Sequence, residues 1–244
     1  MKLLGYTITS DYPLFPTKGK TIVNTINPHS YCISKQDSDF ETALLASDVL
    51  LPDGIGIVWA AKMLNRQTIQ KIAGYDIFIY LMQHLNATKG TCFFLGASEQ
   101  TLALIKRRAS IEFPKVTINS YSPPYKPNFS TEDSTEMCSK VNACQPEVLF
   151  VGMTAPKQEK WVYEHKGQLN ASILCSIGAV FDFYAGTVKR PNQFWISTGL
   201  EWLPRFLQEP KRLAERNLVS TPKFILEVLS YKIFGKRFLS SKSI

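Results

Sequence analysis

The sequence predicts an α/β protein with a mostly parallel sheet at its core and a helical appendage at the C-terminal end. Short apolar runs rich in β-branched and aromatic residues alternate with longer segments of helical periodicity, which is the pattern of repeated βα units. Several of these runs stop at a glycine or a proline, as strands do where they enter a loop. Near Lys189 the composition changes to basic and aromatic residues interrupted by prolines. Helices are therefore expected on both faces of the sheet, with a helical segment following it.

The individual elements follow the chain in order. The expected strands are 21–26, 49–51, 91–95, 116–120, 148–151 and 173–177. The expected helices are 40–46, 57–64, 75–85, 99–111, 130–141 and a segment that begins at Lys157. Beyond Lys189 we expect helical pieces broken by Pro204, Pro210 and Pro222, because proline lacks the backbone N–H that a helix interior needs.

The net charge of +8 is concentrated at the C-terminal end of the chain. Residues 189–244 contain 11 Lys and Arg against four Asp and Glu, whereas residues 1–188 are nearly neutral. The same tail contains eight aromatic residues: Phe194, Trp195, Trp202, Phe206, Phe224, Tyr231, Phe234 and Phe238. Basic and aromatic residues on helical segments are typical of proteins that bind a membrane surface or a nucleic acid. We expect a core of residues 1–188 and a membrane-docking appendage of residues 189–244. A tail that packs its aromatics on the core is the second interpretation, and nucleic-acid binding the third.

Cysteine content and hydropathy argue against several classes of protein. The five cysteines include no C-x-x-C pair, which argues against a disulfide framework or a structural zinc and for a reducing compartment. We also expect no signal peptide, and no helix that spans a bilayer, because we find no run of about 18 apolar residues.

One junction between a strand and a helix combines a glycine with a polar helix start. The apolar run 148–151 ends at Gly152, and Lys157, Gln158 and Glu159 open a helical pattern. Open α/β sheets bind ligands at the carboxyl ends of their strands, and a helix N-terminus there presents free N–H groups to an anion. An ordinary βα loop with a solvated polar start explains these residues equally well.

Asp53 follows the strand 49–51 and precedes Gly54, at the edge of the sheet where ligands bind. An aspartate held there could take a proton from a hydroxyl nucleophile. On spacing alone, a cap for the helix that begins near Ile55 is the stronger interpretation.

Thr25 and Asn27 lie two residues apart at the end of the strand 21–26, so on a strand they face the same side. Polar residues at that position can bind a sugar or a phosphate. A turn that starts at Asn27-Pro28 is the plainer alternative.

Three other patterns point away from metals and dinucleotides. Asp37-Ser38-Asp39 matches a metal-binding D-x-D, but it precedes a helix and is interpreted as a cap. Gly54-Ile55-Gly56 begins like a dinucleotide fingerprint but lacks the third glycine. The three histidines have no zinc spacing: His29 is a candidate site residue, whereas His84 and His165 are interpreted as surface helix residues.

Taken in order, a series of short motifs resembles the WecG/TagA/CpsF glycosyltransferases of bacterial surface-polysaccharide and wall teichoic acid synthesis. The motifs span most of the chain: Thr25-Ile26-Asn27-Pro28, Leu51-Pro52-Asp53-Gly54, Ala73-Gly74-Tyr75-Asp76, Phe94-Leu95-Gly96, 152–159, 178–186, Lys189-Arg190-Pro191, 199–205 and Glu209-Pro210-Lys211-Arg212. Their order and collective match carry the resemblance, since no single motif is decisive.

The resemblance implies a Rossmann-like core whose C-terminal appendage docks on the inner leaflet of the cell membrane. It implies an inverting, metal-independent transfer of a sugar from a UDP-sugar to a polyprenyl-diphosphate-linked saccharide, similar to N-acetylmannosaminyltransferases. The implied place is the cytoplasmic face of the membrane, and the implied partners are the donor, the lipid-linked acceptor and anionic lipid. No cofactor and no nucleic acid are implied, and a homo-oligomer is compatible with the resemblance.

The resemblance also assigns roles to individual residues. Asp53 matches the proposed base, and Thr25 and Asn27 match positions near the sugar and the diphosphate, with Thr25 placed beside Asp53 among the catalytic residues. Gln158 matches a position near the nucleotide-sugar. Lys71 stands where the family usually has an arginine. The positive charge is kept, but a lysine cannot bind a phosphate through two parallel N–H groups as a guanidinium does.

The remaining expected substrate-binding residues are two glycines and three arginines. Gly96 and Gly152 end two strands at the ligand edge of the sheet. Arg205, Arg212 and Arg216 lie in the tail, where they could close over the UDP diphosphate. A non-catalytic nucleotide-sugar-binding or scaffold protein of a polysaccharide assembly complex is the alternative function.

Overall fold

The computed structural model describes residues 1–15, 19–192, 194–195 and 202–235 of the chain. Within these residues, six strands form one sheet in the order β4-β3-β8-β7-β5-β6, and every neighbouring pair is parallel. The strands are β3 (Thr21–Ile26), β4 (Val49–Pro52), β5 (Thr91–Gly96), β6 (Thr117–Tyr121), β7 (Val148–Gly152) and β8 (Ile173–Ser176). The predicted parallel sheet is confirmed.

Helices connect these strands, and a small antiparallel hairpin precedes them. The hairpin consists of β1 (Lys2–Leu3) and β2 (Tyr6–Thr7). The helices up to the last strand are α1 (Pro28–Ser34), α2 (Ser38–Leu45), α3 (Ile55–Asn65), α4 (Gly74–Thr88), α5 (Glu99–Glu112), α6 (Thr131–Cys144) and α7 (Lys157–His165). After β8 come α8 (Val180–Ala185), α10 (Trp202–Gln208), α11 (Pro210–Ala214), a π-helical segment η1 (Glu215–Ser220) and α12 (Thr221–Phe234).

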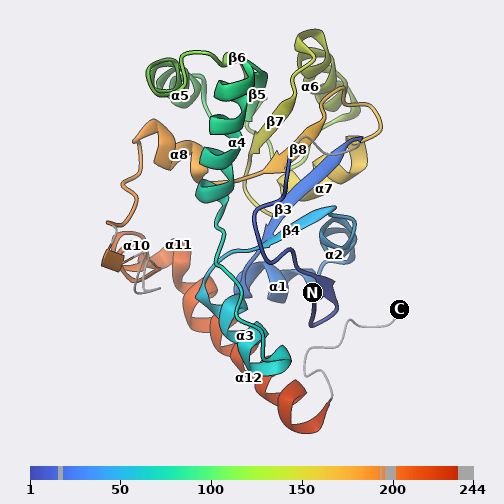
Figure 1. Cartoon of the computed structure of the whole chain (residues 1–244), viewed down its shortest axis with the longest axis vertical. Helices are drawn as coiled ribbons and strands as arrows, with labels where there is room; N and C mark the ends of the chain where they lie inside the picture. The colour runs from blue at the N-terminus through green and yellow to red at the C-terminus, as the bar shows by residue number, and fades with distance from the viewer. Residues whose placement is uncertain (16–18, 193, 196–201, 236–244) are drawn as a thin grey trace.

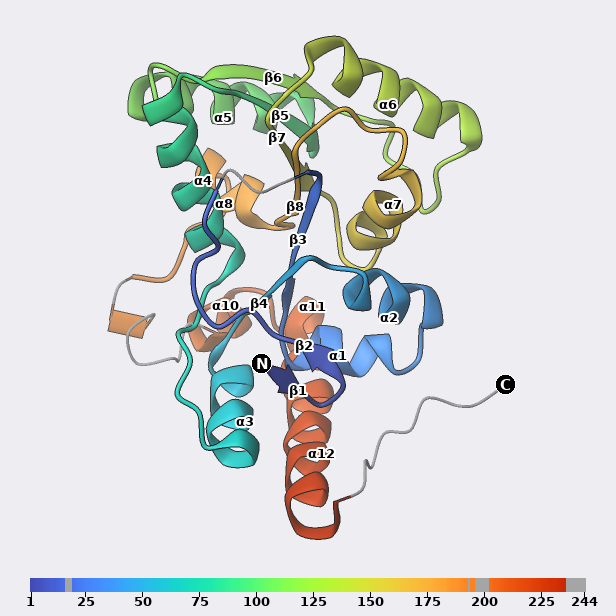
Figure 2. The same ribbon diagram turned by 45° about the vertical axis from the view of Figure 1, so that its right-hand side comes forward.

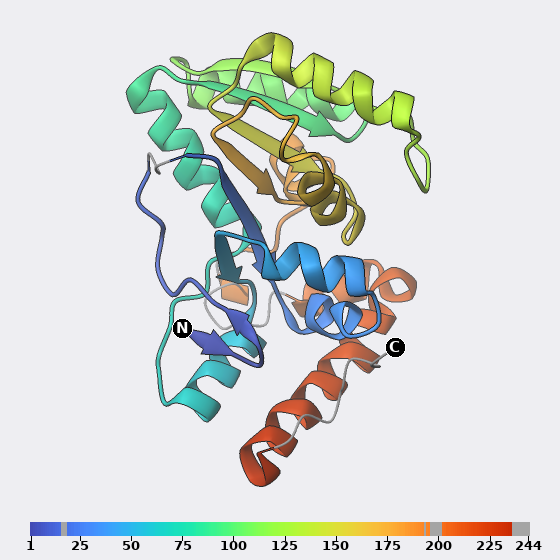
Figure 3. The same ribbon diagram turned by 90° about the vertical axis from the view of Figure 1, so that its right-hand side faces the viewer.

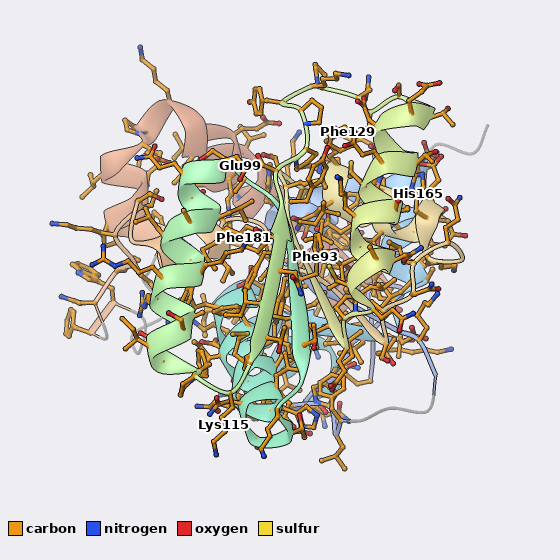
Figure 4. All side chains as sticks on the ribbon, turned by 90° about the horizontal axis from the view of Figure 1, so that it is seen from above. Phe93, Glu99, Lys115, Phe129, His165 and Phe181 are labelled. Carbon is orange, nitrogen blue, oxygen red and sulfur yellow. The ribbon has the colours of Figure 1, made fainter. Side chains whose placement is uncertain are left out.

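Helices cover both faces of the sheet (Figure 1), and its apolar strands are buried, whereas the edge strand β6 is partly exposed. On one face α4, α5 and α8 pack against Val23, Phe94 and Phe150. On the other face α6 and α7 pack against the residues of opposite alternation, such as Ile22 and Phe93. Figure 4 shows α5 and α6 on the two sides of the sheet, with Phe181 and Phe93 in the two layers. This three-layer arrangement is the expected Rossmann-like core.

The C-terminal helix α12 is packed against the N-terminal half of the chain. Its Phe224 and Val228 are fully buried in a third cluster with α1, α3 and the β1–β2 hairpin. The buried Glu227 accepts a hydrogen bond of 3.0 Å from the Tyr31 hydroxyl of α1. Beyond these contacts α12 extends away from the sheet (Figures 2 and 3). Removing α12 would therefore expose part of the apolar interior.

Of the three tail prolines predicted to interrupt helices, Pro222 does not do so. Pro210 is the first residue of α11 and Pro204 lies in the first turn of α10, where a missing N–H costs little. The predicted break at Pro222 is wrong, because η1 runs directly into α12. The Thr221 N–H donates to the Arg216 carbonyl five residues earlier, and this wide π turn accommodates the proline.

Candidate active site

The carboxyl ends of the parallel strands bring most of the predicted site residues to one edge of the sheet. The chain passes from β3 outward to the edge strand β4, and the other strands all lie on the opposite side of β3. Such a reversal leaves a crevice at the carboxyl end of the strand where it occurs. Thr25 lies at the end of β3 and Asn27 directly follows it, Asp53 follows β4, and Gly152 ends β7. The first turn of α7 adds Gln158 at the same edge.

The Asn27 side chain makes hydrogen bonds both to the start of α1 and to Asp53. It is the N-cap of α1, where its Oδ1 accepts hydrogen bonds of 3.0 Å from the backbone N–H groups of His29 and Ser30. Its Nδ2 donates a hydrogen bond of 3.3 Å to Oδ2 of Asp53. The turn considered at Asn27-Pro28 is therefore the start of a helix, with Pro28 at its first position.

Asp53 is not the cap of α3. The N-cap is Gly54, at φ +90, and no side chain caps this helix. The Asp53 N–H donates to the Ile26 carbonyl at 2.9 Å, which ties the turn to the end of β3. Its half-buried carboxylate is turned toward Asn27 instead. The geometry thus places a half-buried carboxylate at the carboxyl edge of the sheet, where open α/β sheets bind ligands.

Two further predicted residues flank Asp53. Thr25 is half-buried and lies beside Leu51 in the β3–β4 register, one strand away from the Asp53 turn. Lys71 is half-buried with its Nζ shielded from solvent. The next residue, Ile72, donates its N–H to the Pro52 carbonyl at 3.0 Å, so Lys71 is held next to the end of β4.

The two predicted glycines are required by close packing. Gly96 has φ +121, and a Cβ there would lie 2.4 Å from the Gly152 carbonyl oxygen. A Cβ on Gly152 would lie 2.4 Å from the ring of Phe181. A side chain at Gly96 would push β5 and β7 apart at their carboxyl ends, and one at Gly152 would push α8 away from the sheet. This steric reason explains the glycines whether or not substrate contacts them.

Gln158 is buried and joins two loops at the sheet edge. Its Oε1 accepts from the Met153 N–H at 3.2 Å and from the Gly178 N–H at 3.0 Å. Its Nε2 donates to Oε1 of Glu159 at 2.8 Å. Glu159 is buried as well, and burial raises its pKa to about 7 although the bond from Gln158 opposes the shift. The burial of Glu159 is not predicted by its position, since a glutamate at a helix start is usually exposed.

The appendage reaches the same edge through η1. The His29 Nδ1 lies 2.8 Å from the Ser220 Oγ, and the Cys32 thiol donates to the Ser220 carbonyl at 3.3 Å. Burial, and then the positive charge of Arg216, lower the pKa of His29 against an opposing effect of Glu215. The predicted residue Arg216 therefore lies near the Asn27 end of the site. The side chains of Arg205 and Arg212 lie outside the part of the chain that is described.

Asp37 is a helix cap, as predicted. Its Oδ1 accepts from the Phe40 N–H at 3.0 Å, and its carboxylate pairs with Lys160 of α7 at 2.9 Å. Burial would raise the pKa of Asp37, but the bonds from Phe40 and Lys160 outweigh it and hold the pKa below its ordinary value. Within the described residues, no three His, Cys, Asp or Glu side chains are grouped to hold a metal ion.

Two motif residues that received no role from the sequence lie together beside the site. Asp76 Oδ2 accepts from the Ala73 N–H at the start of α4, and its Oδ1 pairs with the Arg190 guanidinium at 3.2 Å. The guanidinium also lies 4.0 Å from the centre of the Tyr75 ring. This pair fastens the start of the appendage to α4. A pocket of about 430 Å³ on this flank is lined by Tyr12, Tyr75, Asp76, Ile79, Tyr80, Gln83 and Arg190.

Comparison with known proteins identifies the class of this fold and site. The model of the family described as "Glycosyl transferase WecG/TagA/CpsF family" matches residues 14–238. The protein is a glycosyltransferase, and the carboxyl edge of its sheet is the candidate active site. The chain belongs to the WecG/TagA/CpsF family, as its motifs predicted.

Several relatives share one name, N-acetylglucosaminyldiphosphoundecaprenol N-acetyl-beta-D-mannosaminyltransferase. The protein of Bacillus spizizenii strain W23 is 33% identical over 215 residues, which cover 88% of this chain and 80% of that protein. The protein of Bacillus subtilis strain 168 is 30% identical over 217 residues, covering 89% and 82%. The protein of Staphylococcus aureus strain MW2 is 23% identical over 208 residues, covering 85% and 79%.

Proposed function

We propose that the protein transfers N-acetylmannosamine from a UDP-sugar to an N-acetylglucosamine carried on a polyprenyl diphosphate, with inversion at the anomeric carbon. The names of the relatives supply the transferred sugar and the lipid-linked acceptor. The observation that carries the proposal for this chain is Asp53, a half-buried carboxylate at the ligand edge of the sheet that does not cap α3.

The chemistry needs one base and one stabilised leaving group. In the proposed step the acceptor hydroxyl oxygen attacks the anomeric carbon, Asp53 takes the hydroxyl proton, and the bond from that carbon to the UDP oxygen breaks. Asn27 holds Oδ2 of Asp53, which limits the orientations of the carboxylate. Inversion follows because the hydroxyl attacks the face opposite the departing UDP.

The leaving diphosphate needs positive charge and N–H donors. Lys71 beside β4 and Arg216 of η1 bring positive charge to the edge of the sheet. The first turn of α3, whose N-cap makes no side-chain bond, adds free backbone N–H groups. Fixed dipoles and charges of this kind stabilise a developing anion without a metal ion. We propose that the reaction requires neither a metal nor a cofactor.

The acceptor is a lipid, so we propose that the protein docks on the inner leaflet of the cell membrane. No helix among the described residues has the length and apolar character needed to cross a bilayer. The outer side of α12 instead exposes Ile225, Leu226, Ile233 and Phe234, with Lys223 and Lys232 on the same helix. An amphipathic helix of this kind lies in the membrane interface, and each basic residue near anionic lipid contributes about 1 kcal/mol.

A transfer assay with a panel of UDP-sugars and a short-chain polyprenyl-diphosphate N-acetylglucosamine tests the proposal. We expect turnover with UDP-N-acetylmannosamine and its loss in Asp53→Asn. UDP binding without turnover of any donor would favour the non-catalytic scaffold. Turnover of a different donor would keep the enzyme class and change the sugar.

A further inference from the structure

The buried amide of Gln158 has only one orientation that satisfies its neighbours. The Met153 and Gly178 N–H groups both need an acceptor, and Oε1 of Gln158 lies 3.2 and 3.0 Å from them. A flipped amide would set its NH₂ group against these two donors. The carboxylate Oε1 of Glu159, 2.8 Å from Nε2, accepts from the amide and selects the orientation that fits.

The start of α7 explains why Glu159 turns inward. Glu159 is the third residue of the helix, from which a glutamate usually reaches back to the N–H of the N-cap. Here the N-cap is Pro156, which has no N–H. The side chain is instead 4% exposed and bonds to the neighbouring Gln158.

The other oxygen of Glu159 belongs to a set of buried polar atoms. Among the described residues, Oε2 of Glu159, Oγ of Ser176 and Oδ1 of Asn24 are shielded from solvent without a hydrogen-bond partner. The register pairs Val23 with Cys175, so Asn24 and Ser176 come next on the adjacent strands β3 and β8. They lie two residues after Ile22 and Leu174 and so on the same face of the sheet, the face that packs against α7, the helix that carries Glu159.

Burial favours the neutral form of Glu159. Its pKa is raised to about 7, so near neutral pH a large fraction of the carboxyl groups carry a proton. The charged groups nearby on α2 and α7, Asp37 and Lys160, pair with each other, and β8 contributes no charged residue. A neutral carboxyl can still accept the amide hydrogen bond through its carbonyl oxygen, and it avoids the cost of burying a charge.

We propose that Glu159 is a positioning residue for donor binding, which acts by fixing Gln158 so that its Oε1 holds the loops after β7 and β8 together. These loops, around Met153 and Gly178, lie at the carboxyl edge of the sheet. The inference rests on the proposed function, in which the nucleotide-sugar occupies that edge. Glu159 itself touches no substrate in this arrangement, and its effect passes entirely through Gln158.

The test compares Glu159→Met with Glu159→Gln in the full-length protein. Methionine has a similar length but accepts no comparable bond, whereas glutamine keeps an acceptor oxygen. We expect Glu159→Met to weaken UDP binding and raise the donor KM by about fivefold, since one hydrogen bond contributes about 1 kcal/mol. The acceptor KM should not change, and Glu159→Gln should restore donor binding. Glu164→Met, an exposed position on the same helix, is the control.

A double-mutant cycle with Gln158→Ala tests the route of the effect. If Glu159 acts through Gln158, adding Glu159→Met to Gln158→Ala changes UDP affinity no further. Should Glu159→Met fail to fold, Glu159→Asp replaces it, because its carboxylate is one methylene too short for Nε2.

The outcomes separate this inference from the proposed function. Unchanged UDP affinity in the folded Glu159 variants, or additive effects in the cycle, would overturn the positioning role alone. An unsubstituted protein that does not bind UDP would overturn both.

Discussion

Asn27 and Asp53 are joined by a 3.3 Å hydrogen bond from Nδ2 to Oδ2 across the carboxyl ends of two adjacent parallel strands. The same asparagine caps α1 through Oδ1, which accepts from two backbone N–H groups. The cap fixes which way the amide faces, so the NH₂ group has to point toward Asp53. The helix start after β3 thereby orients the carboxylate after β4.

Replacing Asp53 by asparagine should remove the proposed base and leave the fold intact. The new side-chain carbonyl can accept the same bond from Asn27, so UDP binding and the melting temperature should stay near those of the unsubstituted protein. We expect transfer to fall by about 10²–10⁴, the usual contribution of a positioned base. Asp39→Asn, at an exposed position of α2, is the matched control. Near-normal turnover of Asp53→Asn with saturating acceptor would mean that Asp53 is not the base.

Replacing Asn27 by aspartate separates its two tasks. A carboxylate oxygen still caps α1, so the free energy of unfolding should change little. The donor to Asp53 is lost, and two carboxylates face each other, so transfer should fall sharply. Asn27→Ala should in addition lose about 1 kcal/mol of stability, the usual value of an N-cap. Chemical denaturation and initial rates of the two variants check this split, and equal stability losses would contradict it.

The sequence was most informative about the sheet and about the edge where the strands end. Each predicted strand exists, since apolar β-formers bounded by glycine or proline leave little choice, and Asp37 caps α2 as expected. The short α1 was missed because its seven residues, which begin at Pro28, show no helical period of their own. The burial of Glu159 could not be read from local pattern either. Pro156 removes the local N–H partner, but the burial itself depends on β8 bringing Gly178 to Gln158, a contact between two segments separated in the chain.

The buried carboxyl of Glu159 should make stability fall as the pH rises. Its folded pKa is about 7, against 4.5 for an exposed glutamate, so its contribution is complete below pH 4.5 and is lost as the pH passes through 7. At 1.36 kcal/mol per unit, the loss is about 3 kcal/mol. Urea unfolding at acidic and at mildly alkaline pH should show this fall in the unsubstituted protein and a smaller one in Glu159→Gln. Parallel pH curves for the two proteins would show that Glu159 is not buried in the neutral form.

The exposed face of α12 should control binding to anionic vesicles. Serine at Leu226 and Phe234, which are 54% and 71% exposed, removes apolar surface without touching the buried Phe224 and Val228. We expect the double variant to stay folded and to sediment poorly with phosphatidylglycerol vesicles. Binding of the unsubstituted protein should weaken at high salt, because the Debye length is about 8 Å at physiological ionic strength. Ile111→Ser, an exposed apolar position on α5, is the control, and equal sedimentation of both variants would argue against docking through α12.

Transfer should persist in excess EDTA. The carboxylate of Asp37 caps the start of α2 and pairs with Lys160. The D-x-D is therefore poorly suited to bind a divalent ion. Initial rates with and without the chelator check this expectation. Activity that EDTA abolishes and magnesium or manganese restores would bring Asp37 and Asp39 back as metal ligands.

The most direct measurement is product analysis by mass spectrometry. The full-length protein is incubated in EDTA with UDP-N-acetylmannosamine and a short-chain polyprenyl-diphosphate N-acetylglucosamine. We predict a lipid product heavier by one N-acetylhexosamine, released UDP in equal amount, and neither with Asp53→Asn. An unchanged lipid acceptor with every UDP-sugar tested, or equal product from Asp53→Asn, would contradict the assignment of this sheet edge as a glycosyltransferase active site.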